Sequence, residues 1–143
     1  MGETKVVLDT SVIICGLIGK GNSNEILKLI FKDKLKPVIS AEIFNEYVRV
    51  FYYEKLSGIR FKAMIFLDKL YDKAIVIKPK ETFSICRDLA DDKFINAVYA
   101  SKTQCLITLD DDLLRLRDKD KRFYVKGHKF WILKPSEFIK IFC

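Results

Sequence analysis

The sequence has little of what marks a membrane-spanning, secreted or zinc-binding protein. No apolar run approaches the roughly 18 residues that a transmembrane helix needs, and the first residues do not form a basic segment followed by a long apolar stretch. The four cysteines stand far apart without a CxxC pair, and the chain has one histidine, so zinc-ligand spacing is absent. We therefore expect a soluble, cytoplasmic protein with no membrane partner, in which the cysteines are buried or incidental thiols.

Motifs of three enzyme classes are also missing. Residues 19–24 (GKGNSN) do not match the phosphate-binding loop G-x-x-x-x-G-K-[ST]. His128 has no G-x-S-x-G nucleophile elbow to accompany it. Asp9 is not followed two residues later by a second acid, as a haloacid-dehalogenase type of phosphotransferase would require. These absences argue against phosphate-loop, Ser-His-Asp and phosphotransfer chemistry.

The composition favours one globular domain with a basic surface. The 143 residues suit a single domain over residues 1–143, and half of them are hydrophobic, which is enough for a core. The chain carries 26 Lys and Arg against 19 Asp and Glu, so its net charge is +7. A surplus of this size favours a polyanionic partner such as RNA or DNA, although a basic surface can also serve solubility alone.

Apolar runs alternate with amphipathic segments along the whole chain. Five short runs suit buried strands: residues 5–8, 37–40, 74–77, 105–108 and 130–133. Segments with helical spacing or helix start signals lie between or after them: residues 24–31, 41–51, 61–71, 91–101 and 135–142. Because strands that alternate with helices form parallel sheets, we predict an α/β fold with a mainly parallel central sheet of about five strands flanked by helices.

Acidic residues gather where several of these strands end. Asp9 ends the first run, and Asp110 follows the run at residues 105–108 after Leu109. Further acids stand just before or at the start of the predicted helix at 91–101, or on one face of the helix at 41–51: Asp88, Asp91, Asp92, Glu42 and Glu46. Ligands of open α/β sheets bind at the carboxyl ends of the strands. Carboxylates without His or Cys suit a hard cation such as Mg²⁺, Mn²⁺ or Ca²⁺, which can activate water against a phosphodiester.

Each acid also has an ordinary structural interpretation. Asp9 can cap a turn, Asp92 can complement a helix dipole, and residues 110–112 can form a solvated turn. Glu42 and Glu46 can be surface residues of an amphipathic helix. The conjunction of these acids near one predicted edge favours a site over any single residue.

Five segments in order resemble one protein family. They are VVLDTSV (6–12), SAEIFNEY (40–47), RDLADDKFINAVYA (87–100), LITLDDDLL (106–114) and ILKPSEFI (132–139). Together they resemble PIN-domain proteins, particularly the toxin components of toxin–antitoxin pairs that are related to the VapC ribonucleases. The resemblance spans nearly the whole chain and implies a PIN-like fold, a metal-dependent endoribonuclease that uses Mg²⁺ or Mn²⁺, a homodimer, a cognate antitoxin partner and an RNA substrate.

The resemblance also assigns roles to residues. The expected catalytic and metal-binding acids are Asp9, Glu46, Asp92 and Asp110. Competing or additional metal ligands are Asp88, Asp91, Glu42 and Asp112. Hydroxyl side chains expected to orient the acids or a water are Thr10, Ser11 and Thr108.

Two positions depart from the family pattern. Ser11 stands where many relatives have Asn, and Leu109 stands where Gly, Asn or Ser is usual. A bulky residue at 109 could change the path of the loop and the aim of Asp110. The alternative function is therefore a catalytically weak or inactive PIN domain that acts as an RNA- or protein-binding module.

Residues 117–129 form a loop-like stretch that is dense in Lys and Arg. We hypothesise that Lys121, Arg122 and Lys126 hold the RNA backbone there, with Phe123 or Tyr124 stacking on bases.

Overall fold

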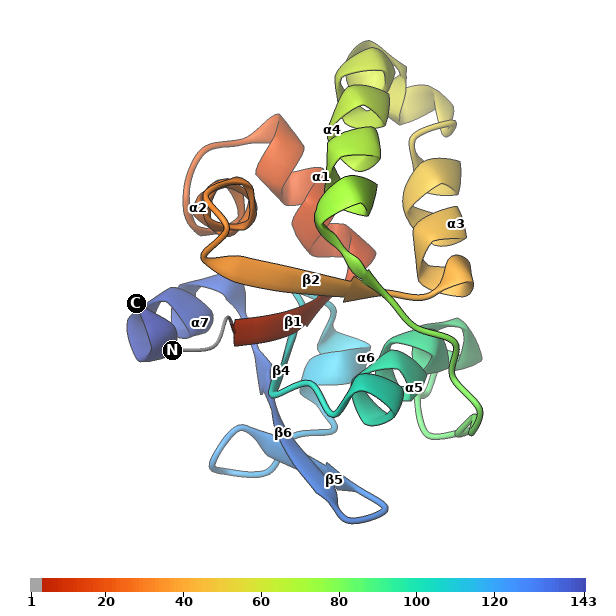
Figure 1. Cartoon of the computed structure of the whole chain (residues 1–143), viewed down its shortest axis with the longest axis vertical. Helices are drawn as coiled ribbons and strands as arrows, with labels where there is room; N and C mark the ends of the chain where they lie inside the picture. Colours follow the sequence, from red (N-terminus) through yellow and green to blue (C-terminus); the bar gives the residue numbers. More distant parts are fainter. Residues whose placement is uncertain (1–3) are drawn as a thin grey trace.

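The computed structural model describes residues 4–143, in which six strands form one sheet (Figure 1). The strands are β1 (Thr4–Leu8), β2 (Leu35–Ile39), β3 (Ile75–Val76), β4 (Cys105–Ile107), β5 (Arg122–Val125) and β6 (His128–Leu133). Their order is β3-β2-β1-β4-β6-β5, and every neighbouring pair is parallel except β5 and β6. The prediction of a mainly parallel α/β fold is confirmed.

The strand that the sequence analysis missed is β5, which lies inside the basic stretch predicted to be loop-like. It pairs with β6 through Val125 and His128, so the turn between them contains two residues, Lys126 and Gly127. Both have positive φ, 46° and 88°, which is the geometry of a tight hairpin turn whose twist matches the strands. The density of Lys and Arg hid the alternation of β5, so the sheet has six strands where about five were predicted.

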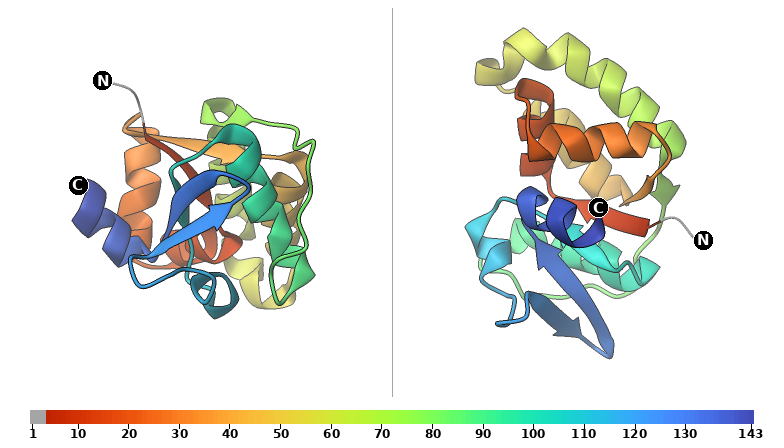
Figure 2. Two further views of the ribbon diagram at one scale, coloured as in Figure 1. Left: turned by 90° about the horizontal axis from the view of Figure 1, so that it is seen from below. Right: turned by 90° about the vertical axis from the view of Figure 1, so that its left-hand side faces the viewer.

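Seven α-helices within the described residues cover the sheet: α1 (Thr10–Ile18), α2 (Asn22–Phe31), α3 (Ala41–Val50), α4 (Arg60–Lys73), α5 (Asp92–Ser101), α6 (Asp111–Leu114) and α7 (Pro135–Phe142). Two 3-10 helices, η1 (Glu54–Ile59) and η2 (Leu89–Asp91), precede α4 and α5. Helices α1 to α4 gather on one side of the sheet and α5 lies on the other (Figures 1 and 2). None of the helices in residues 4–143 combines the length and the hydrophobicity of a transmembrane span.

The core is centred on β1 and β4. Val6, Val7 and Leu8 of β1 and all three residues of β4 are almost completely buried, as expected for central parallel strands covered on both faces.

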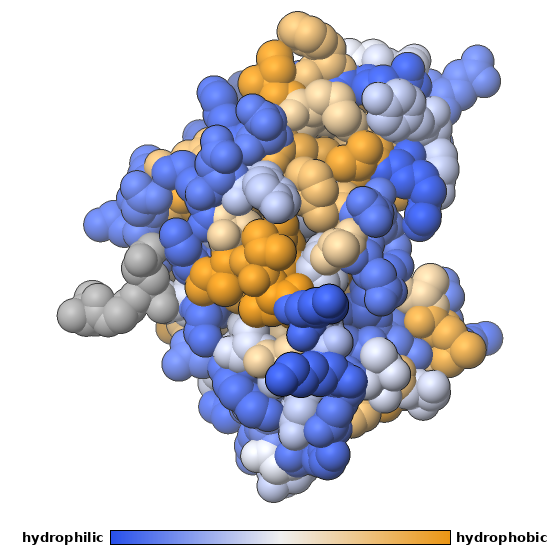
Figure 3. Space-filling model, turned by 45° about the vertical axis from the view of Figure 1, so that its right-hand side comes forward, coloured by the Kyte–Doolittle hydropathy of each residue, from blue (hydrophilic) through white to orange (hydrophobic). Residues whose placement is uncertain are grey.

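The four cysteines are free, two of them buried and two exposed. The face in Figure 3 is largely hydrophilic, and its apolar side chains gather in separate patches.

The strand register brings the carboxyl ends of β1, β4 and β6 to one edge. Leu8 pairs with Ile107, and Ile107 pairs with Leu133. Backbone hydrogen bonds continue beyond the strands, from the Asp9 amide to Ile107 and from the Thr108 amide to Leu133. The residues that follow β1 and β4 are therefore held side by side at this edge.

Candidate metal centre

Asp9 lies in the middle of this edge and is buried. Its Oδ2 accepts hydrogen bonds from Ser11 Oγ (2.7 Å) and Thr108 Oγ1 (2.8 Å). Burial raises the pKa of Asp9; the bonds from Ser11 and Thr108 oppose this rise, while the charges of Asp110 and Glu46 add to it. Because both hydroxyls donate to Oδ2, the other carboxylate oxygen of Asp9 is the one that can coordinate a metal ion or accept a hydrogen bond from a ligand.

Asp110 and Asp112 lie at the start of α6, next to Asp9. The Asp110 amide donates to Thr108 Oγ1 (2.9 Å), and Oδ1 of Asp110 accepts from the Asp112 amide (2.9 Å). Leu109 lies in this turn with its backbone outside the left-handed region and its side chain exposed. Its amide donates to Ser11 Oγ (3.2 Å), so the bulky residue is accommodated.

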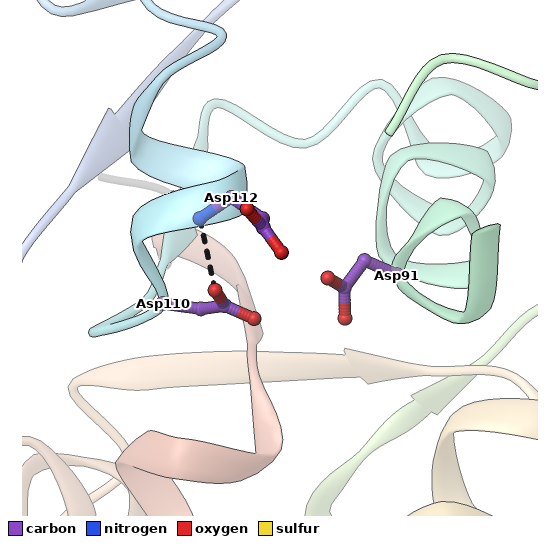
Figure 4. Close-up of side chains that lie close together, drawn as sticks. All are labelled: Asp91, Asp110 and Asp112. Atoms are coloured by element: carbon purple, nitrogen blue, oxygen red, sulfur yellow. Dashed lines mark hydrogen bonds between the residues drawn. The ribbon is translucent and has the colours of Figure 1, made fainter. Parts of the chain in front are cut away.

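Asp91 completes a group of three carboxylates with Asp110 and Asp112. One oxygen from each lies within 4.8 Å of the others, and the three side chains converge from α6 and from the start of α5 (Figure 4). Asp91 is only 8% exposed, and its Oδ2 is buried without a hydrogen-bond partner among the described residues. Burial, followed by the charges of Asp110, Asp9 and Asp88, raises the pKa of Asp91 to about 7.

Asp92 does not belong to this group, although the sequence analysis ranked it ahead of Asp91. Its Oδ1 accepts hydrogen bonds from the backbone amides of Ile85 (3.0 Å) and Cys86 (2.8 Å). The reason is local: η2 ends at Asp91 and α5 begins at Asp92, so the two side chains leave the backbone in different directions. Asp91 therefore takes the place next to Asp110 that was predicted for Asp92.

The other predicted acids lie outside the group of three aspartates, and each has different surroundings. Glu46 on α3 is nearly buried and accepts hydrogen bonds from Thr10 Oγ1 and from Lys93 Nζ (2.5 Å). Asp88 caps η2 by accepting from the Ala90 amide (3.0 Å). Glu42 is exposed and lines a hollow beside α3, outside the group of three. Sequence reasoning missed Lys93, because a lysine in the first turn of an amphipathic helix is ordinarily a surface residue.

Residues 5–112 match the PIN domain family. The chain belongs to the PIN domain family. It is also 36% identical over 144 aligned positions to "Uncharacterized protein MJ1680" of Methanocaldococcus jannaschii, and this likeness covers 98% of the chain and 92% of the relative. Proteins with a PIN domain are typically nucleases with an acidic active site, so the carboxylate edge lies where the activity of this PIN domain is expected.

Two solved structures resemble this PIN domain in fold. One is PAE2754 from Pyrobaculum aerophilum, with a TM-score of 0.58, 15% identity and coverage of 96% of this chain and 88% of that one. The other is VapBC2 from Rickettsia felis, bound to a DNA fragment from its promoter, with a TM-score of 0.56, 11% identity and coverage of 92% and 98%. At these identities the likeness shows the fold.

The carboxylates of this PIN domain fit a hard divalent cation. The group supplies oxygen ligands without His or Cys, which Mg²⁺ and Mn²⁺ prefer. A buried carboxylate oxygen without a donor is costly on its own, and a cation there would remove both the missing interaction and the repulsion within the group. The donor set and the unpartnered Asp91 oxygen therefore agree with an acidic metal site.

The basic residues predicted to contact RNA each have an intramolecular partner. Lys121 pairs with Glu137 (3.1 Å), Lys126 pairs with Glu81 (2.6 Å), and the guanidinium of Arg122 lies 3.6 Å from the centre of the Trp131 ring. Lys126 is in the turn that precedes β6, so it lies at the amino end of this parallel strand, opposite the carboxylate edge. Lys121 and Lys126 still expose 41% and 60% of their side chains.

Proposed function

We propose that this PIN-domain protein is a metal-dependent endoribonuclease in which Asp91, Asp110 and Asp112 hold Mg²⁺ or Mn²⁺. The observation that carries this proposal is the convergence of the three carboxylates around a buried oxygen of Asp91 that has no hydrogen-bond partner within residues 4–143. When bound, the cation supplies an activated water and offsets negative charge on the phosphodiester. Asp9 and Glu46, at the same edge, are the further acids of the proposed site.

Asp9 has the geometry of a residue that positions water or ligand. Ser11 and Thr108 hold one of its oxygens, which fixes the orientation of the carboxylate. Its other oxygen is the one that can accept a proton or a hydrogen bond from an attacking water. Thr10 acts on the neighbouring acid, because its hydroxyl donates to Glu46.

The proposed substrate is RNA and the proposed role is that of a toxin with a cognate antitoxin. The net charge of +7 supports a polyanionic substrate. The ordered sequence resemblance to toxin components supports the toxin role, and the fold likeness to VapBC2 is consistent with it. A cytoplasmic homodimer is the assembly that this role implies, and exposed apolar side chains on α4, Phe61 and Ile65 among them, offer a surface for partners.

Cleavage of labelled single-stranded RNA tests the nuclease proposal. The wild type, Asp91→Asn and the control Asp72→Asn, which makes the same change on an exposed acid of α4, are assayed with Mn²⁺, with Mg²⁺ and with EDTA. We expect cleavage that needs metal, is lost in Asp91→Asn and is kept in Asp72→Asn. Metal-independent RNA binding without cleavage in the wild type would instead favour the binding-module alternative.

The proposed contact of the β5–β6 hairpin with the RNA backbone has a separate test. Replacing both Lys121 and Lys126 with Ala removes two partly exposed charges. We expect RNA affinity to fall by a similar factor for all sequences, and the slope of log affinity against log salt to become shallower by about 1–2. An unchanged slope would exclude these lysines from the RNA contact.

A further inference from the structure

Glu46 is the acid of this edge that already has a cation. The Nζ of Lys93 lies 2.5 Å from Glu46 Oε1, and the two side chains are only 11% and 15% exposed. The other oxygen of Glu46 accepts from the Thr10 hydroxyl. A nearly buried ion pair in which both carboxylate oxygens have donors is held in one geometry, unlike an exposed surface pair.

The three aspartates next to it have no such partner. Within residues 4–143, no lysine or arginine forms an ion pair with Asp91, Asp110 or Asp112. Lys93 stands two residues after Asp91 in the first turn of α5, yet its ammonium group contacts the Glu46 side of the edge. At this edge of the sheet, the charge of Glu46 is thus neutralised by Lys93, whereas the charges of the three aspartates are not neutralised by a lysine of the described residues.

We propose that Lys93 is a built-in cation that takes the place of a second metal ion, so that the centre binds one divalent cation, at Asp91, Asp110 and Asp112. The inference rests on the metal site of the proposed function. The ammonium group already occupies the ligand position at Glu46 Oε1 and would repel a divalent cation there. Within residues 4–143, the three aspartates form no ion pair with a lysine or arginine, so their negative charge can attract one divalent cation.

The surroundings of Lys93 give this fixed charge access to a substrate. Lys93 lines a hollow of about 610 Å³ that lies beside α3 and is also lined by Asn45 and Arg49. A phosphodiester that enters this hollow meets the ammonium group of Lys93, which stands two residues after Asp91 of the proposed metal site. Lys93 thereby positions and neutralises the phosphate where a two-metal nuclease would use its second ion.

The number of Mn²⁺ ions bound per chain, measured by calorimetric titration of the metal-free protein, tests the proposal without an activity assay. We expect one ion in the wild type, and a second, weaker ion in Lys93→Met, because Glu46 then keeps only the longer, 3.9 Å ion pair with the exposed Arg49. Lys93→Arg keeps the charge and should bind one ion. Lys140→Met, which removes an exposed lysine of α7, is the matched control and should also bind one.

A fourth variant protects the test against effects of lost charge on folding. The double variant Glu46→Gln with Lys93→Met removes both members of the pair, and we expect it to bind one Mn²⁺ ion per chain again. Circular dichroism verifies that each variant is folded. Two ions in the wild type, or one ion in folded Lys93→Met with unchanged affinity, would overturn the role of Lys93 and leave the metal site in place. No bound ion in the wild type would overturn the metal site itself, and the role of Lys93 with it.

Discussion

Asp91 and Asp92 are adjacent in the sequence and equally buried, yet their carboxylates have opposite surroundings. Asp92 accepts two hydrogen bonds from backbone amides, whereas Asp91 has an oxygen without a donor in the part of the chain that the structure describes and faces two other carboxylates. The first arrangement satisfies a charge within the protein, and the second leaves a charge that needs a proton or an external cation. Burial alone therefore does not distinguish a structural acid from a functional one. The hydrogen-bond donors to each carboxylate oxygen do distinguish them.

The largest expected effect comes from removing the charge of Asp91 while keeping its shape. Asp91→Asn should lower metal-dependent cleavage by at least about 100-fold, the upper range for loss of groups around a metal site. It should also abolish the rise in melting temperature that Mn²⁺ causes. Asp92→Asn keeps the acceptor for both amides and should stay close to the wild type in both measurements. The opposite pattern in the two variants would return the metal-binding role to Asp92.

Removing the side chain of Asp92 should affect stability instead. Asp92→Ala leaves the amides of Ile85 and Cys86 without their acceptor, which should lower the free energy of unfolding by about 2–4 kcal/mol. Urea denaturation of the metal-free protein measures this change. Asp91→Ala, the matched control, removes no side-chain hydrogen bond to the described residues and should not destabilise the metal-free protein by a similar amount. Equal losses in the two variants would show that both acids are structural.

The raised pKa of Asp91 predicts how the stability of the metal-free protein depends on pH. The folded carboxyl has a pKa of about 7 and the unfolded one a value near 3.8, so between these pH values the folded protein holds a proton that the unfolded chain has released. The free energy of unfolding should therefore fall as the pH rises through this window. Thermal denaturation in EDTA should show that Asp91→Asn has a smaller fall and, at pH 8, is more stable than the wild type by about 1–2 kcal/mol. A variant less stable than the wild type at pH 8 would contradict this account.

The smallest effect is expected at Asp88, whose charge contributes to the raised pKa of Asp91 from a more exposed position. Asp88→Asn keeps an acceptor for the Ala90 amide and removes one negative charge. Calorimetric titration should show Mn²⁺ affinity reduced by less than about threefold, because exposed charges are screened. A loss as large as that in Asp91→Asn would add Asp88 to the metal ligands.

The sequence was sufficient to predict five of the strands and most of the helices, because apolar runs and helical spacing report burial directly. It was not sufficient for β5, a strand of four residues of which only Val125 is buried, because the surrounding Lys and Arg residues made the stretch resemble a loop. Nor could it decide between Asp91 and Asp92. Their side-chain directions depend on whether the helix begins at one residue or the next, and sequence patterns define helix ends only within a few residues. Lys93 was missed because its partner, Glu46, is on another helix.

The sheet order has a consequence for how the protein is made. Asp9 follows β1, Glu46 lies on α3, and Asp91, Asp110 and Asp112 come from segments around α5 and α6. The strand β4, which carries Asp110 to Asp9, is inserted between β1 and β6, late in the chain. A nascent chain on the ribosome therefore cannot assemble the group of three aspartates that would bind the metal until β4 and the first turn of α6 have emerged. If the protein cuts RNA as proposed, this order of synthesis keeps the growing chain inactive while it is still attached to ribosomal RNA and its own message.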